Sequence, residues 1–334
     1  MSRSFLIEGL FCSHVFVQAV RALALLDAME AFPDETQALV SRSVESIVKT
    51  EGQSNHVNEF LWALARGRYF PGKDVMDAVD SWLDAGGLGR LHVSKAVSFL
   101  WAAARVRANS ETCLAAIQAW SPDPKAFSNQ HLVTCLWSLS VMGLVGGATF
   151  EALWTEMVSR ELEVSALSNV YWVQIQQVCM SISLQDSPMQ SLEGSERVKA
   201  TSASSWRHAM EAPKKVSGYQ RQLEITLANM GVYHESEVAC GASGGYSIDV
   251  ALPHHGVAIE MDGPSHQFHN MDVYLGATHM KQQHLTAMGW KVMSVPYREW
   301  DMLYEMASRE VYIEDRLAEL GLNVVPDVAR TKLL

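Results

Sequence analysis

The stretch that decides the fold reads Tyr246-Ser-Ile-Asp-Val-Ala-Leu-Pro-His-His-Gly-Val-Ala-Ile-Glu-Met-Asp-Gly-Pro-Ser-His266. Residues 246–252 and 257–262 are short runs rich in β-branched side chains, in which apolar and polar residues alternate. Such runs are typical of strands, and the four residues between them, Pro253 to Gly256, form a turn of the length found in hairpins. We therefore expect an antiparallel β-hairpin.

The register of this hairpin follows if Leu252 faces Val257, because Asp249 then lies opposite Glu260. Alternation with a period of two gives the hairpin one apolar and one polar face. The apolar face carries Ile248, Val250, Ile259 and Met261, and the polar face carries Ser247, Asp249, Glu260 and Asp262. Like charges facing each other destabilise a hairpin, so we expect a cation, a basic side chain or shared protons against this face.

A crossover follows the hairpin. Residues 278–288 have helical spacing and end at Gly289, and residues 290–295 form a third strand that ends at Pro296. Strand, helix and strand in this order imply a parallel return with a right-handed connection. Another amphipathic helix is expected at 219–230, and a helical tail at 300–320, which completes a small domain with three or four strands.

These residues resemble a RAP domain, an RNA-binding module. The resemblance lies in Ser247-Ile-Asp-Val-Ala-Leu-Pro, Val257-Ala-Ile-Glu-Met-Asp-Gly-Pro-Ser-His266, Lys281 with Leu285, Gly289-Trp-Lys-Val and Val295-Pro-Tyr-Arg-Glu-Trp300. It implies a fold like that of PD-(D/E)xK restriction endonucleases and a role on organellar RNA, often behind a helical-repeat array.

A PD-(D/E)xK nuclease needs an acidic residue on one strand and Glu-x-Lys on the next, because carboxylates hold Mg²⁺ or Mn²⁺ and the lysine activates water. Asp249 and Glu260 match, but Asp262 stands in the place of the lysine. An active enzyme would use Asp249, Glu260 and Asp262 as metal ligands and Lys281 as the missing ammonium, with Glu224 as a further acid. The substitution favours a binding protein that has lost catalysis, with Lys281, Arg298 or a bound ion answering the carboxylates.

Several side chains are candidates for RNA contact. His266 and His269 are spaced as metal ligands or as polar contacts, and Trp300 is suited to stacking on a base or to capping the core. The candidate RNA-binding residues are His266, Lys281, Tyr297, Arg298 and Trp300, with Lys214 and Lys215 in the segment before the domain.

The N-terminal half is helical and repetitive. Leu61-Trp62-Ala63, Leu100-Trp101-Ala102, Leu136-Trp137-Ser138 and Tyr171-Trp172-Val173 recur at spacings of 39, 36 and 35 residues. Repeats of this length predict helical hairpins stacked into an α-solenoid. Large apolar residues at one fixed place per repeat are more often core than base-stacking surface. The units resemble octotricopeptide repeats or the repeats of the Fas-activated serine/threonine kinase family.

Composition limits the function. The 334 residues carry a formal net charge of −11, and Asp and Glu outnumber Lys and Arg from Tyr246 onward, so contact with RNA must be local, based on stacking or assisted by metal. No run reaches the roughly 18 apolar residues of a membrane span. The five cysteines show no Cys-x-x-Cys pair, which disfavours a zinc site or a disulfide framework.

The expected organisation is an α-solenoid at 1–184, a flexible basic linker at 185–217, a RAP domain at 218–320 with its core at 246–300, and a tail at 321–334. The expected function is that of an organellar RNA-binding protein in RNA processing, RNA stability or ribosome assembly, with single-stranded or ribosomal RNA and ribosomal or other RNP proteins as partners. The alternatives are a metal-dependent endoribonuclease and a structural subunit of a mitochondrial or plastid ribonucleoprotein. The resemblance implies a mitochondrion or plastid, although residues 1–11 show no clear presequence.

Overall fold

The chain divides into two compact units in the computed structural model, which describes residues 3–49, 56–162, 164–185, 192, 195–211, 216–240 and 246–322. The helical unit comprises Met1–Ser202 and Gln267–Met280, and the sheet unit comprises Ala203–His266 and Lys281–Leu334.

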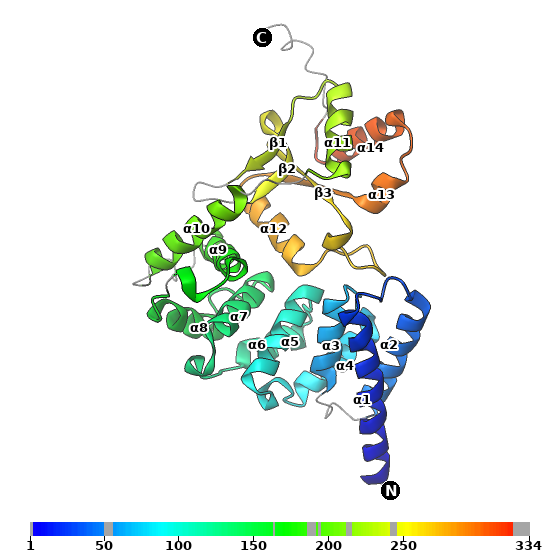
Figure 1. The fold of residues 1–334 in the computed structure, drawn as a ribbon, viewed down its shortest axis with the longest axis vertical. Coiled ribbons are helices and arrows are strands. Elements are labelled where there is room, and N and C mark those ends of the chain that lie inside the picture. Colours follow the sequence, from blue (N-terminus) through cyan, green and yellow to red (C-terminus); the bar gives the residue numbers. More distant parts are fainter. Residues whose placement is uncertain are drawn as a thin grey trace. The chain divides into compact units, whose positions relative to one another are not determined.

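The helical unit is a row of helical hairpins, as predicted (Figure 1). Its first helices, each in contact with the next, are α1 (Arg3–Leu25), α3 (His56–Arg66), α5 (Val93–Val106), α7 (Asn129–Val141) and α9 (Asn169–Leu184). Its second helices, which also contact each other in order, are α2 (Pro33–Val48), α4 (Gly72–Asp84), α6 (Glu111–Ala119) and α8 (Ala148–Ser159). Short 3₁₀ turns lie at Leu88–Arg90, Pro124–Ala126 and Val164–Ala166. The result is a solenoid of two helical layers.

Local sequence explains both the helix starts and the core. Ser110 and Ser128 cap α6 and α7 by accepting hydrogen bonds from backbone N–H groups three residues on. Trp137 and Trp172 are buried, as expected of residues that hold repeats together, whereas Trp62 and Trp101 are only partly buried. The first layer therefore leaves two of its repeated tryptophans accessible.

The predicted linker at 185–217 differs from the structure, because residues Ser195–Glu211 form helix α10. Val198, Ser202 and Trp206 follow each other at intervals of four and are all buried, which is the spacing of one helical face. The hydroxyl of Ser202 donates to Oε1 of Gln176 at 2.9 Å. The many small polar residues of this segment gave it the composition of a linker, although one face of the helix is buried.

The segment Gln267–Met280 packs within the helical unit. Asn270 bonds Phe70 twice, accepting from its backbone N–H at 2.7 Å and donating to its carbonyl oxygen at 3.0 Å. The ring of Phe268 meets that of Phe70 edge-on at 5.3 Å. A Cβ on Gly276 would lie 2.0 Å from the carbonyl oxygen of Ala104, so this approach requires glycine.

The sheet unit contains one four-stranded sheet in the order β1-β2-β3-β4. Its strands are β1 (Glu235–Ala239), β2 (Ser247–Leu252), β3 (Val257–Asp262) and β4 (Lys291–Pro296). The antiparallel β2–β3 pair has Leu252 opposite Val257, and β3 and β4 are parallel, so the predicted register and crossover are confirmed. Gly256 ends the turn in the left-handed region at φ 63°.

Helices cover both faces of this sheet. The apolar face packs with α11 (Gly218–Asn229), α13 (Tyr297–Asp301) and α14 (Met306–Glu319) in one buried cluster that includes Val250, Ile259 and Trp300. The crossover helix α12 (Gly276–Ala287) contributes Lys281 and Gln282 to the other face. Short 3₁₀ turns lie at Pro253–His255 and Pro264–His266. No described helix is long and apolar enough to cross a membrane.

Candidate functional site

The polar face of the hairpin holds the three predicted carboxylates. Glu260 is 4% exposed, and the ammonium of Lys281 on α12 donates to its Oε2. Burial raises the pKa of Glu260 to about 7, although the nearby ammonium of Lys281 opposes that rise. Lys281 is therefore the basic side chain that was expected to pair with these carboxylates.

Asp249 is held by the backbone. Its Oδ2 accepts from the N–H of Met261 at 2.9 Å, and its carbonyl oxygen accepts from Nε2 of Gln220 at 3.0 Å. Burial raises the pKa of Asp249, while the charge of Lys281 opposes the shift. Asp249 and Glu260 therefore share one cation, which limits how much charge this face can carry.

Asp262 has a partner of its own. It is 1% exposed, and its Oδ1 lies 3.1 Å from Nδ1 of His266. The hydrogen bond that the His266 imidazole donates to Asp262 raises the pKa of His266, and burial acts in the opposite direction. A protonated His266 therefore neutralises Asp262 inside the domain.

A metal centre does not fit this arrangement. Oε1 of Glu260 and Oδ2 of Asp262 are buried without a hydrogen-bond partner among the described residues, which is the one feature in favour of a cation. However, no group of three or more described His, Cys, Asp and Glu side chains is placed to hold a metal ion. His269 pairs with Glu30 instead of joining His266, with 3.1 Å between Nδ1 and Oε2. We therefore derive no catalytic step through a metal.

Lys281, the candidate catalytic lysine, and Glu224, the candidate further acid, also have partners within the domain. Lys281 donates to Glu260 and lies 6.0 Å from the ring centre of Tyr246. Glu224 accepts from the hydroxyl of Ser236 at 2.7 Å. Most polar groups of the carboxylate face are thus engaged in ion pairs and hydrogen bonds, and only Oε1 of Glu260 and Oδ2 of Asp262 among its described carboxylate oxygens are buried without a partner.

Trp300 cannot stack on a base, which corrects that prediction. It is fully buried, and its indole N–H donates to Oε1 of Gln222 at 3.0 Å. Tyr297 and Arg298 are half-buried, and Nε of Arg298 donates to the Tyr297 hydroxyl at 3.1 Å. Lys214 and Lys215 lie outside the described residues. Tyr297 and Arg298 therefore keep their candidacy for RNA contact, as do the partly exposed His266 and, less readily, the paired Lys281.

The helical unit carries a feature that total charge conceals. In the first helices α3, α5, α7 and α9, the basic residues are Arg66, Lys95 and Arg105, and the acidic residue is Glu59. The second helices α2, α4, α6 and α8 have two basic residues, Arg42 and Lys73. Their acidic residues are Asp34, Glu35, Glu45, Asp74, Asp77, Asp80, Asp84, Glu111, Glu151 and Glu156. Acidic charge is therefore concentrated in one layer of the solenoid.

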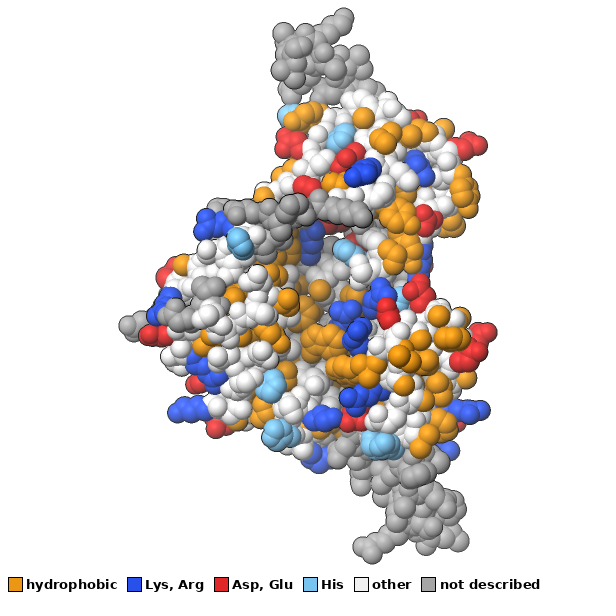
Figure 2. Space-filling view, in the orientation of Figure 1, with side chains coloured by type: hydrophobic (Ala, Val, Ile, Leu, Met, Phe, Trp, Pro, Cys, Tyr) orange, Lys and Arg blue, Asp and Glu red, His pale blue; other side chains and the backbone are white. Residues whose placement is uncertain are grey.

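Cations of the first layer lie against its tryptophans. The guanidinium carbon of Arg21 is 5.5 Å from the ring centre of Trp62, and that of Arg105 is 5.4 Å from the ring centre of Trp101. Lys and Arg side chains gather over the region of α1, α3 and α5 in Figure 2. The repeat is the sequence feature that could have predicted these contacts between cations and tryptophans. Arg21 occupies the place in its repeat that Trp62 and Trp101 occupy in later copies.

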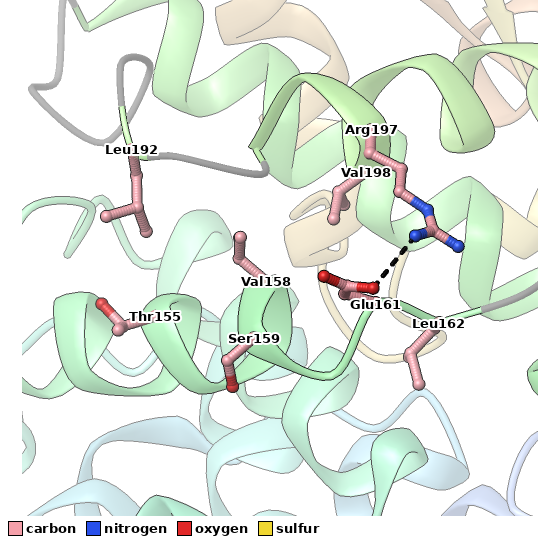
Figure 3. A pocket seen from close by; sticks show the side chains of 8 residues that line it. All are labelled: Thr155, Val158, Ser159, Glu161, Leu162, Leu192, Arg197 and Val198. Atoms are coloured by element: carbon pink, nitrogen blue, oxygen red, sulfur yellow. Dashed lines mark hydrogen bonds and ion pairs between the residues drawn. The ribbon is translucent and has the colours of Figure 1, made fainter.

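A surface pocket of about 300 Å³ lies between α8 and α10 (Figure 3). Half of its lining residues are apolar, namely Val158, Leu162, Leu192 and Val198. Arg197 and Glu161 form an ion pair of 3.2 Å at its rim, where both side chains are at least half exposed. Exposed pairs of this kind contribute little energy, so we assign no ligand to this pocket.

Comparison with known proteins finds a family match in the sheet unit. Residues 259–316 match the family model described as the RAP domain. A RAP domain-containing protein, chloroplastic, from Oryza sativa subsp. japonica is 24% identical over 276 residues. The alignment covers 81% of this chain and 41% of that relative, so the chain spans about two-fifths of the relative's length. Residues 259–316, from β3 through the crossover helix to α14, are a RAP domain.

Proposed function

We propose that this chain is a plastid RNA-binding protein whose helical unit binds single-stranded RNA along its first helices. The observation that carries the proposal is the separation of charge between the two helical layers, since phosphates are attracted to a local basic surface whatever the total charge. Trp62 and Trp101 add partly exposed aromatic surface to the same layer, and bases stack on such rings.

The RAP domain, in this proposal, recognises RNA without cutting it. The lysine that a nuclease would use on water is committed to Glu260, and the described residues do not gather a metal site. Tyr297 and Arg298 form an aromatic and cationic pair at the end of β4, which suits stacking on a base. The resemblance to a RAP domain implies a fold like that of PD-(D/E)xK nucleases, and in this proposal that fold is kept for binding.

The location rests on the relative. The word chloroplastic in the name of the Oryza protein supports a plastid, and it gives the mitochondrion no support. Binding of this kind suits RNA processing, RNA stability or the assembly of ribosomal RNA. Sequencing of the RNA that copurifies with the chain from plastids would separate these roles.

The test is a titration of the full chain with labelled single-stranded RNA of mixed sequence at several salt concentrations. Arg66→Gln at the end of α3, combined with Arg107→Gln at the residue that follows α5, should weaken binding. It should also reduce the slope of log affinity against log salt by about 0.7 for each phosphate that is no longer neutralised. The matched control is Arg42→Gln with Lys73→Gln, which removes the same charge from the second layer and should leave both values unchanged. Equal losses in the two double variants would refute the layered surface.

The same RNA, incubated with Mg²⁺, with Mn²⁺ and with a chelator, tests the enzyme reading. We expect binding without cleavage under all three conditions. Metal-dependent cleavage that is lost in Glu260→Gln would establish a ribonuclease instead. Copurification with a large assembly, together with negligible affinity for free RNA, would identify a structural subunit.

A further inference from the structure

A pocket of about 200 Å³ opens on the first-helix layer. It is lined by Arg21 of α1, by Asn58, Glu59 and Trp62 of α3, and by Lys95 and Ser98 of α5. Each of the three neighbouring first helices thus contributes at least one polar side chain. The pocket lies in the layer that carries the basic residues, and its lining suits a flat polar ligand.

One wall of the pocket is a stacking surface. The guanidinium of Arg21 lies over the ring of Trp62 at 5.5 Å, and both side chains are partly exposed. Planar guanidinium groups and indole rings are the surfaces on which proteins stack single-stranded bases. The wall therefore favours an aromatic ring over a phosphate or a sugar.

The polar edge of the pocket is fixed by Glu59. Its Oε1 accepts from Nζ of Lys95 at 2.6 Å, and its Oε2 accepts from Nε2 of Gln18 at 3.1 Å. Burial acts to raise the pKa of Glu59, but the hydrogen bond from Lys95 and the nearby charges of Lys95, His56 and Arg21 together outweigh it, so the pKa is lowered. The pocket therefore presents a charged acceptor with an ammonium donor beside it.

A second acceptor in the pocket has no partner. Asn58 is 1% exposed, and its side-chain oxygen makes no hydrogen bond to any described residue. Buried polar atoms are nearly always satisfied, so an orphan acceptor in a pocket wall points to a donor on a ligand. This observation is independent of the charge on the layer.

We propose that this pocket binds one base of single-stranded RNA and selects guanine, an inference that rests on the RNA binding proposed above. Along its pairing edge guanine presents one acceptor followed by two donors. The pocket offers the complement, with Lys95 as donor and Glu59 and Asn58 as acceptors. Adenine presents one donor and one acceptor along that edge, and would leave one of the two acceptors unsatisfied.

The repeat explains why guanine should be selected at only one position of the bound RNA. The residue three positions before the Trp62 site is polar in every copy, and its chemistry changes from copy to copy. It is Gln18 in α1, Glu59 in α3, Ser98 in α5, Thr134 in α7 and Asn169 in α9. Among these five, Glu59 alone is a carboxylate, so we expect guanine selection at a single position of the bound RNA.

The experiment selects RNA from a randomised single-stranded pool with the full chain and sequences the bound fraction. Wild type should enrich guanine at one position. Glu59→Gln should lose that enrichment, keep the preferences at other positions and bind the selected RNA on the order of 10-fold more weakly. Asp77→Asn is the matched control, because it removes one acidic charge isosterically from an exposed ion pair on α4 and should leave the selection unchanged.

A second measurement uses wild type alone and is therefore independent of how the variants fold. Inosine, which lacks the 2-amino donor of guanine, replaces the selected guanine in the bound RNA. Affinity should fall for wild type, and where Glu59→Gln folds its affinity should change little. No binding of the pool by wild type would overturn the RNA-binding proposal itself. Binding without an enriched guanine, or with inosine as good as guanine, would overturn the pocket assignment and leave RNA binding in place.

Discussion

Replacing Lys281 by methionine tests how the buried carboxylate face is stabilised. The change leaves Glu260, which is 4% exposed, without its ammonium partner. With Lys281 present the pKa of Glu260 is about 7, and because the ammonium lowers that value, the pKa must rise further in the variant. Below pH 7 the carboxyl is then protonated in both proteins, and the loss should be about 1–2 kcal/mol for the missing hydrogen bond.

Above pH 7 the two proteins differ, because Glu260 is ionised in wild type and still protonated in Lys281→Met. The free energy of unfolding lost by the variant should therefore grow by about 1.4 kcal/mol per pH unit, to about 3 kcal/mol at pH 8. Full burial of an unpaired charge would cost about 3–5 kcal/mol. In wild type the raised pKa of Glu260 also makes stability fall as pH rises. The raised pKa stabilises the fold below the usual pKa of 4.5, and this stabilisation is lost as pH rises to about 7.

The assay is hydrogen exchange of the amides of β3 in the full chain, measured by mass spectrometry at pH 6 and pH 8. Lys291→Met, at an exposed lysine of the neighbouring strand, is the control and should change the opening free energy by less than about 0.5 kcal/mol. Lys281→Met combined with Glu260→Gln should abolish the difference between the two pH values. A loss in Lys281→Met that is equal at pH 6 and pH 8 would refute the reasoning.

Three further predictions concern single side chains. Gly276→Ala should speed hydrogen exchange in the helical unit, because its Cβ would meet a backbone carbonyl oxygen at 2.0 Å, whereas Gly263→Ala, with open space within 4 Å, should change little. Trp300→Ala should cost about 3–5 kcal/mol in thermal or urea unfolding, and any preparation that folds should bind RNA normally. Asp262→Asn should lower the pKa of His266 toward 6.5 in an NMR titration, and an unchanged pKa would contradict the role of their hydrogen bond.

Local patterns predicted the sheet unit well. Alternation with a period of two fixes which side chains share a face, so the pairing of Leu252 with Val257 followed from the sequence, and so did the carboxylate face. Electrostatics alone also predicted that a cation, a basic side chain or shared protons would lie against that face. The sequence could name Lys281 only as one of several partners for the carboxylates. The segment that joins strand β3 to the helix of Lys281 has a path that the sequence does not determine.

The sequence predictions that were wrong concern features that depend on contacts between residues far apart in the chain. Trp300 lies in the short helix α13 directly after β4, and its full burial and the hydrogen bond that its indole N–H donates to Gln222 show that it faces inward. The segment Gln267–Met280 belongs with the helical unit through Asn270 and Phe70, which are 200 positions apart in the chain. In α10 the buried spacing of Val198 and Trp206 was hidden by a composition that is typical of linkers.

Total charge proved the least informative property of this chain. A net charge of −11 argues against phosphate binding only if the charge is spread evenly. Alternate helices of a solenoid lie in different layers, so a repeat sequence can place acids in one helix of each hairpin and keep them out of the other. Between α2 and α9 the acids follow that rule, with Glu59 as the exception in the first layer. Because that exception lies in a pocket beside Lys95 and the orphan oxygen of Asn58, it is better explained by base selection than by chance.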